Sequence, residues 1–361
     1  MRKIKELANR YFIDGLGAMA LGLFATLIIG TIIGQLGVLV SRYISENIGT
    51  YFASAATVAK AATGAGIGVA VAVKYKQSPL LAAAAGVCGM LGAHSADLSK
   101  LASPGEPLGA FVAALIGIEI GRLVSGKTKL DIVLTPLVTI AAGSVTAFLV
   151  SGPISSFMTW LGSLVNISVD AHPVIGGVIV STLMGIFLTL PISSAAIGIS
   201  LGLSGLAAGA AVVGCSCQMI GFAVTSYRDN GFGGFIAQGV GTSMIQIPNI
   251  IRKPTIWIAP TLASAVLGPI SSAVLKMTNT PSGSGMGTSG LVGQIQAFSE
   301  EAGMVSKFGS VQTLIFVLCM HVIAPAVLAL IFDLVLRKIG WVSKGDMKLG
   351  DRDDAKEAKR K

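Results

Sequence analysis

The sequence predicts an all-α integral membrane protein with about ten transmembrane helices, and three observations carry that prediction. Hydrophobic residues make up 53% of the 361 residues, charged residues make up 12%, and the mean hydropathy is +0.78. Soluble domains contain about 25% charged residues, so a water-soluble fold of this size would lack the charges to cover its surface. The charges also cluster at the two ends of the chain and in short stretches between apolar runs. This pattern favours helices that cross a lipid bilayer.

Apolar runs of nearly membrane-spanning length follow one another along the chain, since a transmembrane helix needs about 20 apolar residues. The ten expected spans are residues 15–40, 51–73, 79–93, 108–124, 132–150, 173–190, 201–225, 232–250, 256–275 and 311–336. The stretch 154–167 is interrupted by serine and glycine, and we expect it to lie along the outer membrane surface.

The basic residues indicate how the spans are oriented. Lys and Arg gather near both termini, and cytoplasmic loops of membrane proteins carry an excess of these residues. With both termini in the cytoplasm, ten spans place three basic loops, at 74–76, 122–129 and 252–253, on the cytoplasmic side. We therefore expect a multi-pass protein of a bacterial cytoplasmic (inner) membrane.

This topology divides the chain into three parts. They are a cytoplasmic N-terminal segment (1–14), a transmembrane domain (15–336) and a charged cytoplasmic tail (337–361). The net charge of +9 then belongs to loops and tails that face anionic lipid headgroups. No contiguous segment has the basic face and base-reading side chains of a nucleic-acid-binding surface, so we expect the lipid bilayer and not a nucleic acid as the partner.

Two stretches at apparent membrane depth are rich in glycine, proline and hydroxyl-bearing residues. In 188–204, Pro191 removes a backbone donor that lipid cannot replace, and 278–298 carries no charged residue. Interrupted segments in the two halves of a transporter are where half-helix ends and unwound backbone bind the substrate. We therefore expect a small polar solute, neutral and hydroxyl-rich or zwitterionic, at these segments. A tight turn in the first and a flexible outer loop in the second stay open as alternatives.

Polar side chains in and beside these stretches are the candidate solute-binding residues. Between the two stretches, Gln238, Thr242, Ser243 and Gln246 recur at three- and four-residue intervals, as on one face of a helix. Such a stripe contacts either the solute or a neighbouring helix. The imidazole of His172, at the mouth of the sixth span, is a further hydrogen-bonding group. The full candidate set is His172, Thr189, Ser193, Ser194, Gln238, Thr242, Gln246, Asn279, Ser284, Thr288, Ser289 and Gln294.

Ionisable residues within the spans are few. Glu119 and Arg122 are three residues apart and are expected to pair on their helix. Asp333 either snorkels or pairs with Arg337, four residues on, and Asp131 is placed to cap a helix start. No His, Cys and carboxylate cluster has metal-ligand spacing, and no phosphate-binding loop is present. We expect no metal, cofactor or catalytic residue, and the four cysteines are expected to be buried thiols.

Four stretches carry a family resemblance. They are KTKLDIVLTPLVT (127–139), HPVIGGVIVSTLMGIFLTLPISSAAI (172–197), GTSMIQIPNIIRKPTIWIAPTLASAVLGPI (241–270) and GMGTSGLVGQIQAF (285–298). In these stretches the sequence resembles the EIIC membrane subunits of the bacterial sugar phosphotransferase system. The similarity is greatest to the type 2 EIIC-like group, which includes proteins labelled perfringolysin O regulator (PfoR).

The resemblance implies a fold of about ten membrane helices with two re-entrant hairpins, usually as a homodimer. The solute would lie between a transport domain and a dimerisation domain. It also implies that a separate EIIB protein, acting in trans, donates phosphate to the bound sugar from the cytoplasmic side. EIIC itself is not phosphorylated in these systems.

The sequence departs from that family pattern at the hairpins. Sugar-handling members carry a glutamate and a histidine in or beside them, and neither 191–200 nor 278–290 contains one. Phosphoryl transfer then lacks a base for the sugar hydroxyl. Three functions stay open: an EIIC translocator, a phosphorylation-independent secondary transporter of a sugar, organic acid or amino acid coupled through Asp131 or Glu119, and a membrane-bound regulator that signals through 344–361.

Overall fold

The chain folds into helices throughout the part that the structure describes. This computed structural model describes residue 6 and residues 9–95, 97–101, 105–165, 169 and 172–350. Within these residues every regular element is a helix, and the one strand-like pairing is an isolated bridge between Gly205 and Asn279. The prediction of an all-α fold is confirmed. Of the expected terminal segments, residues 1–5, 7 and 8 and residues 351–361 lie outside the described residues.

The chain divides into two compact units. Unit 1 comprises Met1–Asn166, Pro191–Ser200 and Ser289–Val292, and unit 2 comprises Ile167–Leu190, Leu201–Thr288 and Gly293–Lys361. The two interrupted stretches of the sequence are therefore divided between the units. Pro191–Ser200 belongs to unit 1, and most of the second stretch belongs to unit 2.

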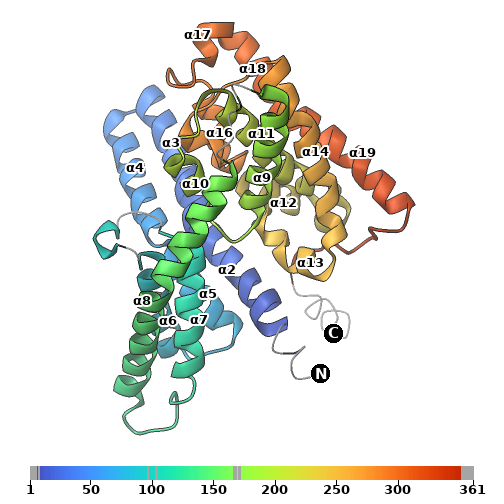
Figure 1. Ribbon diagram of the computed structural model, residues 1–361. Coiled ribbons are helices and arrows are strands. Elements are labelled where there is room, and N and C mark those ends of the chain that lie inside the picture. The colour runs from blue at the N-terminus through green and yellow to red at the C-terminus, as the bar shows by residue number, and fades with distance from the viewer. Residues whose placement is uncertain are drawn as a thin grey trace. The chain divides into compact units, whose positions relative to one another are not determined.

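The described part of unit 1 consists of helices, three of which form a layer. The helices are η1 Asn9–Gly15, α2 Leu16–Leu23, η2 Phe24–Ile28, α3 Ile29–Tyr43, α4 Glu46–Ala61, α5 Thr63–Lys74, α6 Pro79–Ala93, η3 Leu98–Lys100, α7 Pro107–Gly121, α8 Asp131–Val165, α10 Ser194–Ser200 and η8 Ser289–Leu291. Helix α4 packs along α3, and α6, α7 and α8 lie side by side (Figure 1).

Small residues set the close approach of the unit 1 helices. A Cβ at Gly89 of α6 would overlap the carbonyl oxygen of Gly64 in α5, and a Cβ at Gly92 would overlap that of Gly109 in α7. Lipid is as apolar as a leucine side chain, so helices in a membrane associate through such close packing and not through the hydrophobic effect.

Unit 2 is built around α11. Its helices are α9 Pro173–Thr189, α11 Gly205–Thr225, α12 Tyr227–Ile236, η4 Ala237–Gly241, η5 Ser243–Gln246, α13 Ile247–Arg252, η6 Pro254–Trp257, α14 Ile258–Pro269, η7 Ile270–Val274, α15 Pro281–Ser284, α16 Val292–Gln296, α17 Met304–Phe308, α18 Ser310–Leu318, η9 Cys319–Ile323 and α19 Ala324–Lys338. Helix α11 packs against α9, α14 and α19. Because 89% of its most apolar 18-residue window is buried, α11 is a core helix of this unit.

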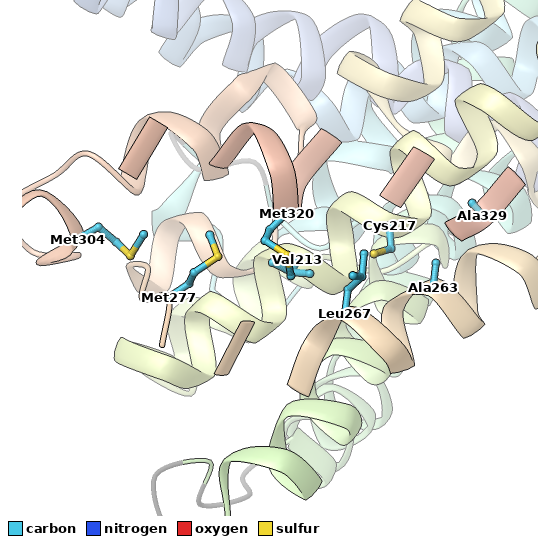
Figure 2. Close-up of a cluster of buried hydrophobic side chains, with 8 residues drawn as sticks. All are labelled: Val213, Cys217, Ala263, Leu267, Met277, Met304, Met320 and Ala329. Carbon is cyan, nitrogen blue, oxygen red and sulfur yellow. The ribbon is translucent and has the colours of Figure 1, made fainter. Parts of the chain in front are cut away.

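A cluster of buried side chains joins several unit 2 elements (Figure 2). Val213 and Cys217 of α11 pack with Ala263 and Leu267 of α14, with Met320 of η9 and with Ala329 of α19. Met277 and Met304 extend this cluster towards the segment that follows η7. Methionine and small side chains fill irregular gaps, which lets short and bent helices pack together.

The structure supports part of the expected set of spans. Among the described residues, five helices are long and apolar enough to cross a membrane, namely Asn9–Val38, Asp131–Val150, Gly205–Thr225, Pro254–Val274 and Ser310–Lys338. Helices α4 and α5, bent by 51°, make a sixth if they form one span. The expected spans 79–93, 108–124 and 173–190 correspond to the shorter apolar helices α6, α7 and α9. The count of ten stays a prediction.

The expected span 232–250 is wrong as a continuous helix. It breaks at Thr242, whose backbone is extended (φ −160°, ψ 142°) and whose hydroxyl accepts the N–H of Met244. A threonine side chain can bond to nearby backbone groups in place of the helical hydrogen bonds. The neighbouring Gly239 and Gly241 also have low helix propensity, because glycine loses more conformational entropy than other residues when it becomes helical. The four polar residues of this stretch therefore do not share one helix face.

The described part of the stretch 154–167 continues the helix of the fifth expected span, and its place along the outer membrane surface stays a prediction. Helix α8 runs without interruption from Asp131 to Val165 and contains Pro136 and Pro153. At 1.5 Å per residue its length is about 52 Å, well beyond a hydrocarbon core of about 30 Å. Proline bends a membrane helix without ending it when neighbouring groups satisfy the freed carbonyl.

We predict that Gly214→Ala destabilises the protein. A Cβ at Gly214 of α11 would overlap the backbone carbonyl of Ser181 in α9, so the two helices would have to separate, at a cost of about 1–3 kcal/mol. Thermal unfolding in detergent measures the change. The control Gly233→Ala, which meets nothing within 4 Å, should leave the melting temperature unchanged or slightly higher. Equal melting temperatures for both variants would contradict the close packing of α9 and α11.

Candidate functional site

The second interrupted stretch, residues 278–298, is a packed hairpin, which we call the second hairpin. The side chain of Asn279 donates to the carbonyl of Gly293 at 2.8 Å and accepts the N–H of Thr280 at 2.8 Å. A Cβ at Gly283 of α15 would lie 2.9 Å from that of Gln296 in α16, so the two short helices are in contact. The positive φ of Gly287 turns the chain between them. Asn279 is 1% exposed, which argues against a flexible outer loop.

Three candidate hydroxyls of the second hairpin have different surroundings. Thr288 donates to the carbonyl of Gly239 in η4, and Ser284 donates to the carbonyl of Pro281 in its own turn at 2.8 Å. These two hydroxyls hold the hairpin in place. The hydroxyl of Ser289, which belongs to unit 1, is buried and has no hydrogen-bond partner within the described residues.

Gln294 of the second hairpin is hydrogen-bonded to His321, which is not among the candidate residues from the sequence. The Nε2 of Gln294 lies 3.0 Å from Nδ1 of His321 in η9. The Oε1 of Gln294 and the Nε2 of His321 are both buried, and neither has a partner among the described residues. If the amide donates to Nδ1, neutral His321 presents an N–H and Gln294 an oxygen; with the amide flipped, the roles exchange. Either way the pair offers one donor and one acceptor, which is what a hydroxyl group needs.

A buried polar network includes Thr189 at the end of α9. Its hydroxyl lies 2.8 Å from that of Ser243 and 3.4 Å from Oε1 of Gln218 in α11. Gln218 also accepts from the indole of Trp257 at 2.9 Å and donates to Thr261 at 3.1 Å. Sequence reasoning missed Gln218, although a glutamine within an apolar helix is a signal for interhelical hydrogen bonding.

We call residues 232–250, which break at Thr242, the broken stretch. Its two candidate glutamines bind each other and the backbone. Gln246 donates to Oε1 of Gln238 and to the carbonyl of Met347, at 2.8 and 2.9 Å. Gln238 in turn donates to the hydroxyl of Ser226 at 2.8 Å. This arrangement favours the alternative in which the polar stripe contacts neighbouring segments. His172 lies apart from this network, exposed at the start of α9, and its side chain makes no capping hydrogen bond.

In the first interrupted stretch, which we call the first hairpin after the family expectation, α10, with the buried Ser194, follows the turn at Pro191. Within unit 1 the backbone N–H of Ser193 donates to the carboxylate of Glu106, which also accepts the N–H of Leu108 at 3.4 Å. Although the segment 191–200 itself contains no glutamate, the structure therefore places one beside it. Glu106 comes from a loop distant in sequence, so its proximity is a consequence of tertiary structure.

Burial decides the charge of Glu106, which precedes α7 and lies outside that apolar helix. Loss of water around the carboxylate raises its pKa from the usual 4.5 to about 7, although the N–H groups of Leu108 and Ser193 act in the opposite direction. A carboxylate with a pKa near neutrality can both accept and release a proton under cellular conditions.

The acidic residues considered for ion coupling are already engaged. Glu119 accepts from Arg122 at 2.6 Å, which confirms the expected pair, and also from Arg10 at 2.8 Å. Asp131 accepts from the hydroxyl of Thr135 at 2.6 Å and from a loop N–H. Both carboxylates therefore have structural roles that a coupling ion would have to disrupt.

We predict that Asn279→Ala loosens the second hairpin. The change leaves the carbonyl of Gly293 and the N–H of Thr280 without their partner in a buried place, at a cost of about 1–3 kcal/mol. Thermal unfolding and protease sensitivity of the hairpin measure the effect. Ser282→Ala, which removes one contact at the hydroxyl of Thr280, is the control and should have a smaller effect. A variant Asn279→Ala as stable as the control would argue against the clamp.

Comparison with known proteins identifies the family. A family model described as "Phosphotransferase system, EIIC" matches residues 13–349, which is nearly the whole chain. No curated protein matches the chain. The apolar helices, the interrupted segments and the all-α fold agree with a multi-pass membrane protein of this kind. The chain belongs to the EIIC family of the phosphotransferase system, whose members are sugar-transporting membrane subunits.

Proposed function

We propose that this protein carries a sugar or sugar-like solute across a bacterial cytoplasmic membrane, with a phosphate-donating EIIB protein acting in trans. Family membership supports the general role. The observation that carries the specific proposal is that each hairpin is hydrogen-bonded to a carboxylate or an imidazole. Glu106 accepts a hydrogen bond from the first hairpin, and His321 bonds to Gln294 of the second.

The chemistry of the second hairpin favours an uncharged, hydroxyl-bearing solute. The Gln294 and His321 pair leaves one buried donor and one buried acceptor unpartnered among the described residues. A buried polar group without a partner costs about 1–3 kcal/mol, so a hydroxyl that bonds to both atoms would bind favourably. The hairpin has no charged residue to balance a carboxylate or ammonium group.

Glu106 is suited to the proton transfer that phosphorylation requires. As the sugar hydroxyl oxygen forms its bond to phosphorus, the bond between phosphorus and EIIB breaks and the hydroxyl proton moves to a base. An ionised Glu106 can accept that proton. A base with a pKa of about 7 is matched to this task at neutral pH.

The proposed orientation in the membrane follows from the distribution of basic residues. Both termini and the basic loops 74–76, 122–129 and 252–253 would face the cytoplasm and the incoming EIIB protein. The division into residues 1–14, 15–336 and 337–361 and the homodimer of the family belong to this proposal. The remaining candidate residues would orient the solute through hydroxyl and amide groups.

A phosphorylation-independent permease is the second candidate. Glu119 and Asp131 are engaged by neighbouring groups, so the group better placed to couple a proton is Glu106. A proton-coupled transporter would bind its proton below about pH 7 and lose it above that value. The two functions therefore predict opposite pH dependences.

We predict that sugar uptake by proteoliposomes requires phosphorylated EIIB and depends on Gln294 and His321. Labelled sugars, polyols and organic acids are offered to the purified protein with and without this donor. The double variant Gln294→Met, His321→Leu should lose uptake by about tenfold or more. Its melting temperature should hold or rise, since both partners of the buried bond become apolar.

The control for this experiment is Ser282→Ala, which should transport normally. Uptake without any donor would contradict obligatory phosphorylation. A double variant with full uptake would remove the pair from the solute site, whereas a variant that unfolds more easily would make the pair structural.

We predict that the phosphorylating uptake rises with pH through about 7 and that Glu106→Gln removes this dependence. A base must be ionised, and burial keeps Glu106 protonated below its raised pKa. Because the pKa of Glu106 is raised on folding, the free energy of unfolding of the wild type should decrease as the pH rises from 4.5 to about 7. The Glu106→Gln variant should lack this decrease. Uptake that decreases as pH rises would favour the proton-coupled permease.

A further inference from the structure

The last described residues of the chain fold back onto unit 2. After α19 ends at Lys338, the chain turns at Gly340 (φ 79°). Val342 and Met347 are then buried, at 3% and 0% exposed. They pack with Phe222, Ile250, Ile256, Ala259 and Leu336 in one hydrophobic cluster. We call residues 341–349, a part of the expected charged tail, the C-terminal strap.

The strap is held mainly through its backbone. The carboxylate of Asp229 accepts the N–H groups of Gly345 and Met347 at 2.9 and 3.3 Å. Asn230 accepts the N–H of Leu349 at 2.7 Å and donates to the carbonyl of Met347 at 2.9 Å. Since backbone groups are common to every residue, the one large side chain that fixes the register of the strap is the fully buried Met347.

The segment 246–253, after the break at Thr242, supplies further polar contacts to the strap. Gln246 and Asn249 donate to the carbonyls of Met347 and Lys348 at 2.9 and 3.0 Å. Lys253 forms an ion pair with Asp346 at 3.5 Å. Without the strap these buried amides would lose acceptors, so docking of the strap and the conformation of the broken stretch are energetically coupled.

The same contacts continue to the second hairpin within unit 2. Gln246 donates to Gln238, and the next residue, Gly239, accepts the hydroxyl of Thr288 through its carbonyl. The stretch between them contains the break at Thr242 and has a π-helical turn at η4. A segment that already departs from regular helix can adopt a second arrangement at modest cost.

We propose that the C-terminal strap is a releasable latch on the second hairpin. When docked, it fixes the broken stretch and, through Gly239, the position of Thr288. When released, it removes one of the two acceptors of the Gln246 amide and one of the two acceptors of the Asn249 amide. The η4 turn and the hairpin then become mobile together. This coupling is a property of the fold and does not depend on which solute is carried or on phosphorylation.

Hydrogen exchange of the second hairpin tests the latch without any solute. Met347→Ser weakens the docking of the strap, and the amides of residues 280–288 and 293–296 should then exchange about tenfold faster or more. Met19→Ser, at an equally buried methionine of unit 1, is the control and should not change exchange in these residues. Faster exchange confined to the strap and its hydrophobic cluster would overturn the proposal.

A cross-link provides the reverse experiment and guards against general unfolding. Cysteines at Lys253 and Asp346, a pair with partly exposed side chains outside the buried network, are joined by a short thiol-cleavable reagent. Cys319 is exposed, contrary to expectation, and is first changed to serine; the other three cysteines are buried. Joining the pair should slow exchange in the second hairpin, and reduction should restore it. Unchanged exchange in the cross-linked protein would overturn the latch.

Uptake measured on the same samples separates this inference from the proposed function. Cross-linking should lower uptake and reduction should restore it if the latch opens during transport. A wild-type protein without uptake would contradict the proposed function, while the exchange of the hairpin would still decide for or against the latch.

Discussion

The lack of hydrogen-bonding groups in lipid is the constraint on which the rest of this structure depends. Each backbone or side-chain polar group at membrane depth must find its partner within the protein. The buried amides of Gln218, Gln238 and Asn279 all meet this condition with named partners. Among the buried exceptions within the described residues are Oε1 of Gln294 on the second hairpin and Nε2 of His321 in η9, two side chains that are hydrogen-bonded to each other through their other polar atoms.

The same constraint explains why close packing and hydrogen bonding occur together in unit 2. The hydroxyl of Ser181 in α9 donates to the carbonyl of Ser264 in α14 at 2.8 Å, and Ser264 donates to the carbonyl of Gly214 in α11 at 3.1 Å. Such bonds to carbonyls require helices that approach closely, which Gly214 permits. One helix of this three-helix scaffold, α11, packs against two irregular segments, α15 of the second hairpin and the η4 turn.

Irregular backbone is therefore concentrated where function is proposed. The second hairpin, the first hairpin with Glu106 and the stretch held by the C-terminal strap are each built from short helices and turns. Segments of this kind are the least stable parts of a fold and the ones most easily moved. A transporter needs both properties, since a fixed scaffold positions the solute and mobile segments let it pass.

The amino-acid sequence by itself determined the membrane class, the location of most apolar helices and the two interrupted segments. These features depend on local composition and spacing, as do the helix pairs Glu119 with Arg122 and Asp333 with Arg337. Local patterns did not predict that α8 passes through Pro153, because the partners that stabilise such a proline are not neighbours in sequence.

Tertiary structure alone decided which side chains meet at the hairpins. Glu106 lies 87 residues before Ser193, His321 lies 27 residues after Gln294, and Gln218 lies 29 residues after Thr189. Their contacts arise because helices buried in a low-dielectric interior bring distant polar groups together to satisfy one another. Residue periodicity reports which face of a helix is apolar, but the identity of the helix that packs against it is set by the three-dimensional fold.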